Sequence, residues 1–162
     1  ANNINTSRPS FVSTKYPKSI SRSIKSNNYF TCLSSFSVKS NIARYKQPCR
    51  YVLKITNGSA ETQIVKARLS VSTYSDKHDS NECYAYFDKV ISLGVKCSTE
   101  LTIDYDWVDN VSLFFQGAQQ QPDNFWRKQI EPGAQTYSII AALFGSQGKE
   151  LDKLEIFQRL EK

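Results

Sequence analysis

The sequence contains no methionine, one histidine and only six glycines among 162 residues. Nucleophilic catalysis needs a histidine beside a positioned serine or cysteine, but His78 lies in the loop-like stretch DKHDSN and no GxSxG element is present. So few glycines leave no glycine-rich loop for a phosphate, and without a CxxC pair His78 lacks the spacing of a zinc ligand. We therefore expect a protein that is not an enzyme and that holds no zinc.

Long apolar runs are also missing. No window approaches the roughly 18 consecutive apolar residues of a membrane-spanning helix. The length fits one domain that buries a core of its own. Because the chain starts at Ala1 and contains no methionine, we expect it to be processed, either by signal-peptide cleavage or by removal of an initiator methionine.

Alternation of apolar and polar residues is clearest between Cys49 and Tyr74. A period of two is typical of half-buried antiparallel strands. Between the two alternating halves, Asn57-Gly58 accepts the positive φ angles of a tight turn, so the stretch predicts a β-hairpin. The residues predicted to face the core are Tyr51, Leu53, Ile55, Val65, Ala67, Leu69 and Val71.

Further strands are predicted on both sides of this hairpin. Alternation recurs over residues 101–107 and 111–115, and a strand at 84–91 is expected to be interrupted near Asp88. The apolar run at 137–144 predicts a strand covered on both faces. A first strand at 29–38 is expected to place Phe30, Cys32, Phe36 and Val38 on one face.

The C-terminal segment fits two structures. Apolar residues recur every three positions from Leu151 to Leu160, which suits a short helix with one apolar stripe. The preceding stretch GSQG is typical of a turn, after which LEIFQRL would return as a strand. We favour the strand because it completes a sheet.

About eight short strands separated by turn signals predict an all-β protein, an antiparallel β-sandwich of the immunoglobulin-like or jelly-roll type. Residues 1–28 are expected to form an extended basic arm and residues 29–162 the sandwich domain. The stretch LKITNGSAETQIVKARLSV resembles the strand pairs of extracellular immunoglobulin-like modules. The resemblance implies architecture alone, because the Cys…Trp…Cys pattern of true immunoglobulin domains is missing.

Four cysteines allow three disulfide pairings. We favour Cys32–Cys49 and Cys83–Cys97, because each bond would tie neighbouring strands through a loop of modest length. Disulfides persist in oxidising compartments and would place the protein outside the cell. The alternative is four reduced thiols in a cytosolic protein, packed as small apolar groups.

Charge is strongly segregated along the chain. Ten basic residues and no acidic one precede Glu61, so this part carries +10 while the remainder carries −4. Three interpretations follow: the basic third binds an external polyanion, it lies on acidic parts of its own fold or of a neighbouring subunit, or its charges form a solvated surface. The predicted contact residues are Lys15, Lys18, Arg22, Lys25, Lys39, Arg44, Lys46, Arg50, Trp126 and Arg127.

Trp126 and Arg127 join this set because tryptophan and arginine are enriched in binding hot spots. The alternative for Trp126 is inward packing, with the cations alone outside.

An acidic cluster follows the strand at 101–107. Asp104, Asp106 and Asp109 carry the oxygen ligands that Ca²⁺ prefers, so a weak calcium site is predicted. Asp104 and Asp106 would also be the carboxylate pair of a glycoside hydrolase, the least unlikely enzyme for this chain. A third interpretation is a polar strand face opposite Lys66 or Arg68.

We expect a non-enzymatic, extracellular β-sandwich that binds an acidic partner or assembles with copies of itself. Its basic N-terminal third would make the contact, and the Asp104–Asp109 face would accept it. The alternative is a small viral coat protein with a jelly-roll fold whose basic arm faces nucleic acid.

Overall fold

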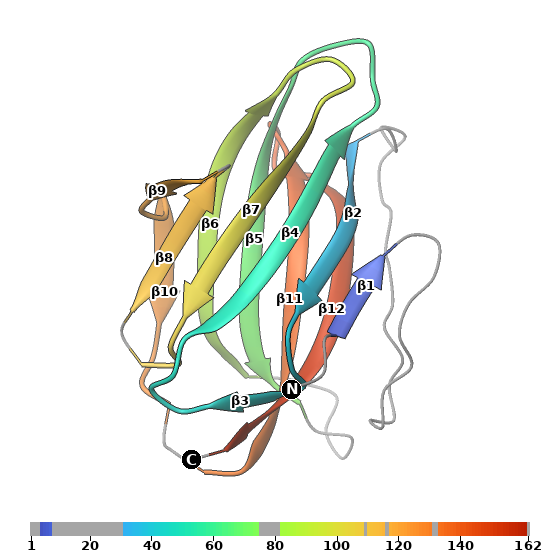
Figure 1. The fold of residues 1–162 in the computed structure, drawn as a ribbon. Coiled ribbons are helices and arrows are strands. Elements are labelled where there is room, and N and C mark those ends of the chain that lie inside the picture. Colours follow the sequence, from blue (N-terminus) through green and yellow to red (C-terminus); the bar gives the residue numbers. More distant parts are fainter. Residues whose placement is uncertain are drawn as a thin grey trace.

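The computed structural model describes residues 31–74, 82–108, 110–115, 117–130 and 133–161, together with the main chain of the strand Ile4–Ser7. These residues form two six-stranded sheets packed face to face, as the alternation predicted (Figure 1). The described ranges contain no helix, and therefore none that could cross a membrane. More strands are present than the eight expected, because the three- and four-residue edge strands are too short to show a period in the sequence.

Sheet A faces the viewer in Figure 1 and is antiparallel throughout. Its strands, in spatial order, are β1 (Ile4–Ser7), β2 (Thr31–Val38), β4 (Cys49–Asn57), β7 (Ser98–Tyr105), β8 (Val111–Phe115) and β9 (Ala118–Gln120).

Sheet B lies behind sheet A, and β3 adds a parallel edge to it. Its strands, in spatial order, are β10 (Asn124–Arg127), β6 (Cys83–Leu93), β5 (Gln63–Thr73), β11 (Gln135–Gly145), β12 (Glu150–Glu161) and β3 (Ile42–Arg44).

The core lies between the sheets and consists of the predicted inward faces. The seven apolar residues predicted from the alternating stretch are all buried, as are Leu101, Ile103 and Leu113 from the next two strands. One end of the core is aromatic. Trp107 is fully buried and contacts Tyr105 and Tyr137 at ring-centroid distances of 5.4 and 4.9 Å.

The predicted hairpin between β4 and β5 is wrong, because the two strands belong to different sheets. Neither Asn57 nor Gly58 has a positive φ angle, so no tight hairpin turn forms. Asn57 is instead fully buried, and its Nδ2 lies 2.9 to 3.1 Å from the carbonyl oxygens of Glu61, Leu93 and Gly94. The side chain thus fixes an arch that carries the chain from sheet A to sheet B. Inward alternation on both strands agrees equally with a hairpin and with an arch.

Two strands depart from the prediction in detail. A register shift between Leu33 and Ser35 bulges β2, so that Leu33 is buried and Cys32 is not. Strand β6 runs without interruption through Asp88, whose carboxylate is satisfied by a bidentate ion pair with Arg68 at 2.7 and 2.9 Å. The acidic residue Asp88 in this strand therefore marks a buried ion pair and not the predicted interruption of the strand.

The C-terminal segment is a strand, so the helical alternative is wrong. Strand β12 pairs with β11 along its whole length and carries β3 on its other side. Part of the predicted N-terminal arm also belongs to the sandwich, since Ile4–Ser7 pairs with β2 as an edge strand. The rest of residues 1–28 lies outside the described residues.

The predicted disulfides are not present, because none of the four cysteines is bonded to another. Cys32 lies opposite Thr56, seven positions along β4 from Cys49, which at about 3.4 Å per residue is far beyond the roughly 7 Å limit for bonded Cα atoms. Cys83 and Cys97 are separated by the full length of β6. Few residues separate the cysteines of each predicted pair, but most of these residues belong to extended strands, which hold the cysteines apart.

Candidate functional site

The chain leaves sheet A after β2, forms β3 on the edge of sheet B, and returns to sheet A as β4. Several main-chain bonds fix this excursion. Tyr45 N donates to Glu161 O at 3.0 Å, and Lys46 N donates to Asp106 O at 3.0 Å. The second bond holds Lys46 at a φ of 68°, a conformation that non-glycine residues rarely adopt.

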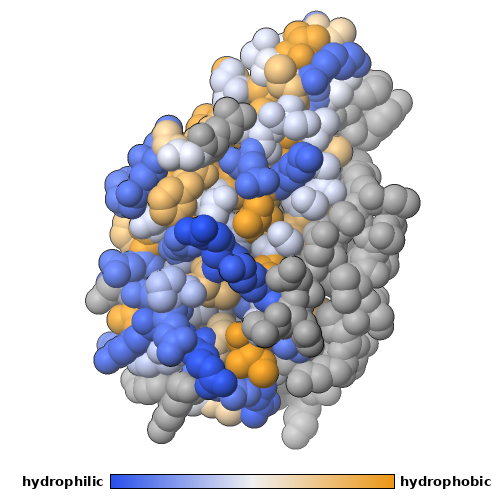
Figure 2. All heavy atoms as spheres, in the orientation of Figure 1, coloured by the Kyte–Doolittle hydropathy of each residue, from blue (hydrophilic) through white to orange (hydrophobic). Residues whose placement is uncertain are grey.

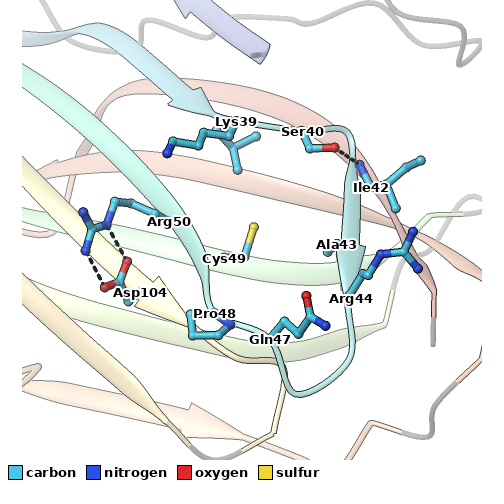
Figure 3. Close-up of a pocket in the computed structure, with 11 residues that line it drawn as sticks. Lys39, Ser40, Ile42, Ala43, Arg44, Gln47, Pro48, Cys49, Arg50 and Asp104 are labelled. Atoms are coloured by element: carbon cyan, nitrogen blue, oxygen red, sulfur yellow. Dashed lines mark hydrogen bonds and ion pairs between the residues drawn. The ribbon is translucent and has the colours of Figure 1, made fainter. Parts of the chain in front are cut away.

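The excursion encloses a cleft of about 640 Å³. Figure 3 shows the Cys49 thiol at its centre, with Arg44 on the opposite side from Arg50 and Lys39 above. Asp104 is the one carboxylate among the described residues that line it. The cleft therefore presents three cations against one anion. We call it the basic cleft, and its charged residues are Lys39, Arg44, Arg50 and Asp104.

Arg50 and Asp104 form a bidentate pair across β4 and β7, with nitrogen–oxygen distances of 2.8 and 2.9 Å. This hydrogen bonding raises the pKa of Arg50 above its ordinary value. The Arg50 side chain is 57% exposed, and its guanidinium lies 5.5 Å from the ring centre of Phe114. The guanidinium of Arg50 stays on the surface, and the ion pair with Asp104 fixes its direction. Arg50 is therefore oriented before any partner binds.

A buried glutamine supports the floor of the cleft. Gln158 on β12 donates through Nε2 to Ser40 O at 2.9 Å and to Cys49 Sγ at 3.3 Å. Its Oε1 accepts a 2.5 Å hydrogen bond from the Tyr51 hydroxyl. One side chain of sheet B thus ties both ends of the excursion to the core.

Burial raises the pKa of the Cys49 thiol, and the hydrogen bond from Gln158 only partly opposes this effect. A thiol with a raised pKa stays protonated at neutral pH, whereas the thiolate is the nucleophile and the metal ligand. Cys49 therefore packs as a small apolar group.

The structure brings together part of the predicted contact set. Lys39, Arg44 and Arg50 line the cleft, and Lys46 is exposed beside it with its ammonium 5.8 Å from the Tyr45 ring centre. Trp126 and Arg127 lie on β10, at the opposite edge of sheet B from β3. The remaining four, Lys15, Lys18, Arg22 and Lys25, lie outside the described residues.

The predicted calcium ligands have other partners. Asp104 pairs with Arg50, and Asp106 Oδ1 accepts hydrogen bonds from Val108 N and Asn110 N at 2.9 and 3.0 Å. No group of three acidic, cysteine or histidine ligands gathers in the part of the chain that the structure describes. Asp109 lies outside that part, so the calcium site stays a prediction. The strand face is polar as expected, but its cation is Arg50 and not Lys66 or Arg68.

Comparison with known proteins does not assign the chain to a family. No family model and no curated protein matches it. Similar solved structures include a β-glucuronidase from Bacteroides uniformis, with TM-score 0.48, 9% identity, and coverage of 76% of this chain and 12% of that one. The alkylpurine DNA glycosylase AlkC of Pseudomonas fluorescens has TM-score 0.43 and 9% identity, with coverage of 88% and 30%.

A β-glucosidase from Kluyveromyces marxianus has TM-score 0.43 and 17% identity, with coverage of 82% of this chain and 14% of that one. The chain thus spans less than a third of the length of each of these proteins. At such TM-scores the similarities assign neither an activity nor a ligand.

Gln158 is the residue of this site that sequence reasoning missed. It stands at an inward position of β12 among Leu154, Ile156 and Leu160. An amide at an inward position between apolar neighbours is the signal that would have found it, because a buried amide needs hydrogen-bond partners.

Proposed function

We propose that this protein is a non-enzymatic binding module that takes acidic groups of a partner macromolecule into the basic cleft. The observation that carries the proposal is the hollow of about 640 Å³ with three cations on its walls and one carboxylate that is already paired. Cations on a concave, fixed surface act together on an anion, and at physiological salt they act only within about 8 Å.

The cleft also supports the second interpretation of the charge segregation, in part. Arg50 is neutralised by Asp104 of its own fold, so the predicted acidic acceptor is already engaged within the chain. Lys39 and Arg44 are exposed at the cleft. Hydrophilic side chains also gather across the visible face of sheet A, broken by isolated hydrophobic ones (Figure 2). A polar partner surface therefore fits this side of the molecule.

The first test is retention on a heparin column eluted with a salt gradient. We expect Lys39→Glu and Arg44→Glu each to elute at clearly lower salt than the unmodified protein. Lys54→Glu is the matched control, because Lys54 is an exposed cation of the same basic third that does not line the cleft. Equal losses for all three variants would show that net charge alone is responsible, and elution of the unmodified protein at low salt would reject the proposal.

An extracellular location remains a proposal of its own. It rested on two disulfides, and neither predicted pair lies within bonding distance. The basic cleft would still suit a protein that binds polyanions at a cell surface. Fractionation of the producing cells would test the location directly.

A further inference from the structure

A second hollow of about 570 Å³ lies on the outer face of sheet B, away from the basic cleft. Its floor consists of small and apolar side chains from two central strands, Ser70 and Ser72 on β5 with Ile140 and Ala142 on β11. Aromatic rings stand beside this floor: Trp126 and Tyr86 on one side and Phe144 on the other. We call this hollow the outer groove.

The strand register explains why the groove forms. Trp126 lies opposite Tyr86, Tyr86 opposite Ser70, and Ser70 opposite Ile140. One row of side chains across four strands therefore begins with two bulky aromatic rings and continues with smaller side chains. At about 4.8 Å between strands, this row spans roughly 14 Å. The volume falls within the range of about 300 to 1,000 Å³ that is usual for small-molecule sites.

The rings are held in place before any ligand binds. Trp126 contacts Tyr86 edge-to-face at 6.2 Å, and the Arg68 guanidinium lies 4.3 Å from the Tyr86 ring centre. Arg68 is in turn fixed by its bidentate pair with Asp88, which is 3% exposed. Despite these contacts Trp126 remains 43% exposed, so it is accessible to a ligand.

Charge on this face is balanced, in contrast to the basic cleft. The cations Lys66, Arg68 and Lys153 stand among the carboxylates Asp88, Glu150 and Glu155 on the same outward side of the sheet. The Lys66 ammonium lies 4.0 Å from Asp88 and within 5.3 Å of the Phe144 ring centre. A ligand with a net charge of either sign gains little from such a surface, whereas a neutral ligand with many donors and acceptors matches it.

The hydroxyls on the floor of the outer groove favour a polar ligand over an apolar one. Within the residues that the structure describes, the hydroxyls of Ser70 and Ser72 make no hydrogen bond. An apolar peptide side chain laid over them would remove them from water without a partner, which is unfavourable. Sugar hydroxyls would instead satisfy them, while the C–H face of the same sugar ring packs on the exposed indole.

We propose that the outer groove binds a neutral carbohydrate chain, with a hexopyranose ring stacked on Trp126 and its hydroxyls bonded to Ser70 and Ser72. Arg68 and Tyr86 are positioning residues: Arg68 contacts the Tyr86 ring, and Tyr86 contacts Trp126 and fixes the orientation of its ring. This site is independent of the basic cleft, so the protein would hold an acidic partner at one edge and a neutral glycan on the face of sheet B.

Intrinsic fluorescence offers a direct readout, because the sequence has two tryptophans and the other one, Trp107, is fully buried. Cellohexaose, maltohexaose and mannohexaose are titrated into the full chain. We expect at least one of them to change the emission with a dissociation constant of about 1 mM or tighter. The same sugar should bind at least about tenfold more weakly to Trp126→Ala, the usual scale for loss of a stacked aromatic, by calorimetry.

Phe125→Ala is the matched control. Phe125 is the neighbouring residue on the same edge strand and is 50% exposed, but its register with Phe87 places it on the other side of the sheet. We expect it to leave sugar binding unchanged. Ser70→Val, which keeps a good strand residue and removes the hydroxyl, should weaken binding without loss of fold by circular dichroism.

Three results would overturn the proposal: no sugar of the panel binds, Phe125→Ala weakens binding as much as Trp126→Ala, or the groove binds an apolar dye while every sugar fails. The last result would point to an apolar protein partner. Lys39→Glu should lower the salt concentration at which the protein elutes from heparin and leave sugar binding intact, so failure of the cleft and failure of the groove are separate outcomes.

Discussion

Two arginine–aspartate pairs of nearly identical geometry show how burial decides the contribution of a single residue. Arg50–Asp104 and Arg68–Asp88 are both bidentate and both join adjacent strands. The Asp104 side chain is 21% exposed and the Asp88 side chain 4%. Removing a buried partner leaves the other charge poorly solvated, whereas an exposed pair is compensated by water.

We therefore expect Asp88→Asn to lower the free energy of unfolding by about 2 to 3 kcal/mol, below the full cost of a buried pair because Arg68 is partly exposed. Asp104→Asn should cost less than about 1 kcal/mol. Urea denaturation of both variants measures the difference. Equal losses would mean that burial does not separate the two pairs.

Free thiols give a second prediction at the scale of residues. All four cysteines should titrate with a thiol reagent in denaturant without added reductant, because the strands keep them apart. In the native protein the exposed Cys83 and Cys97 should react first. Cys49 should react slowly even as the pH rises toward 9, since burial raises the pKa of its thiol. Two or fewer titratable thiols in denaturant would contradict the structure.

The tyrosines of the aromatic end of the core predict a loss of stability at high pH. Burial raises the pKa of Tyr137 to about 12, from an ordinary value of 10.0. Because the folded pKa lies above the unfolded one, this contribution to stability is complete below pH 10 and is lost as the pH rises toward 12. Phenolate absorbance should appear together with unfolding in this window. Phenolate formed at pH 10 by all tyrosines of a still-folded chain would contradict it.

At the scale of elements, strand faces could be predicted from the sequence but strand partners could not. Alternation identified the buried side of β4, β5 and β7 correctly, because a period of two records which side chains avoid water. The same alternation does not indicate to which sheet a strand belongs. Asn57-Gly58 therefore predicted a hairpin, whereas the buried amide of Asn57 makes an arch.

The basic cleft was predictable only in part for the same reason. The run of cations without acids singled out Lys39, Arg44 and Arg50, but it could not show that β3 would leave sheet A and enclose a hollow. Pairing of β3 with β12 depends on residues more than a hundred positions apart. Trp126 was grouped with these cations, and the sheet order places it at the opposite edge.

The arch gives a prediction for one element. Asn57→Ala removes the amide that binds three carbonyl oxygens, of which that of Leu93 is in a buried contact and those of Glu61 and Gly94 are in partly buried ones. We expect a loss of about 2 to 3 kcal/mol in the free energy of unfolding. Asn124→Ala on the exposed strand β10 is the control and should change it by less than about 0.5 kcal/mol. A harmless Asn57→Ala would show that the arch does not depend on this side chain.

At the scale of the whole molecule, the sandwich separates two kinds of surface. The charged cleft lies at the edge where β3 joins sheet B, and the aromatic groove lies on the outer face of that sheet toward β10. Assembly with copies of this chain and the viral coat alternative both remain predictions, since each depends on contacts beyond one chain.

Amide NMR spectra recorded during titration with a short heparin oligosaccharide would separate binding by the basic cleft from attraction by the overall charge. We expect shift changes concentrated in residues 38–50 and at Asp104, saturating with the ligand and disappearing at high salt. Changes spread over every exposed lysine and arginine, or confined to another surface, would contradict it.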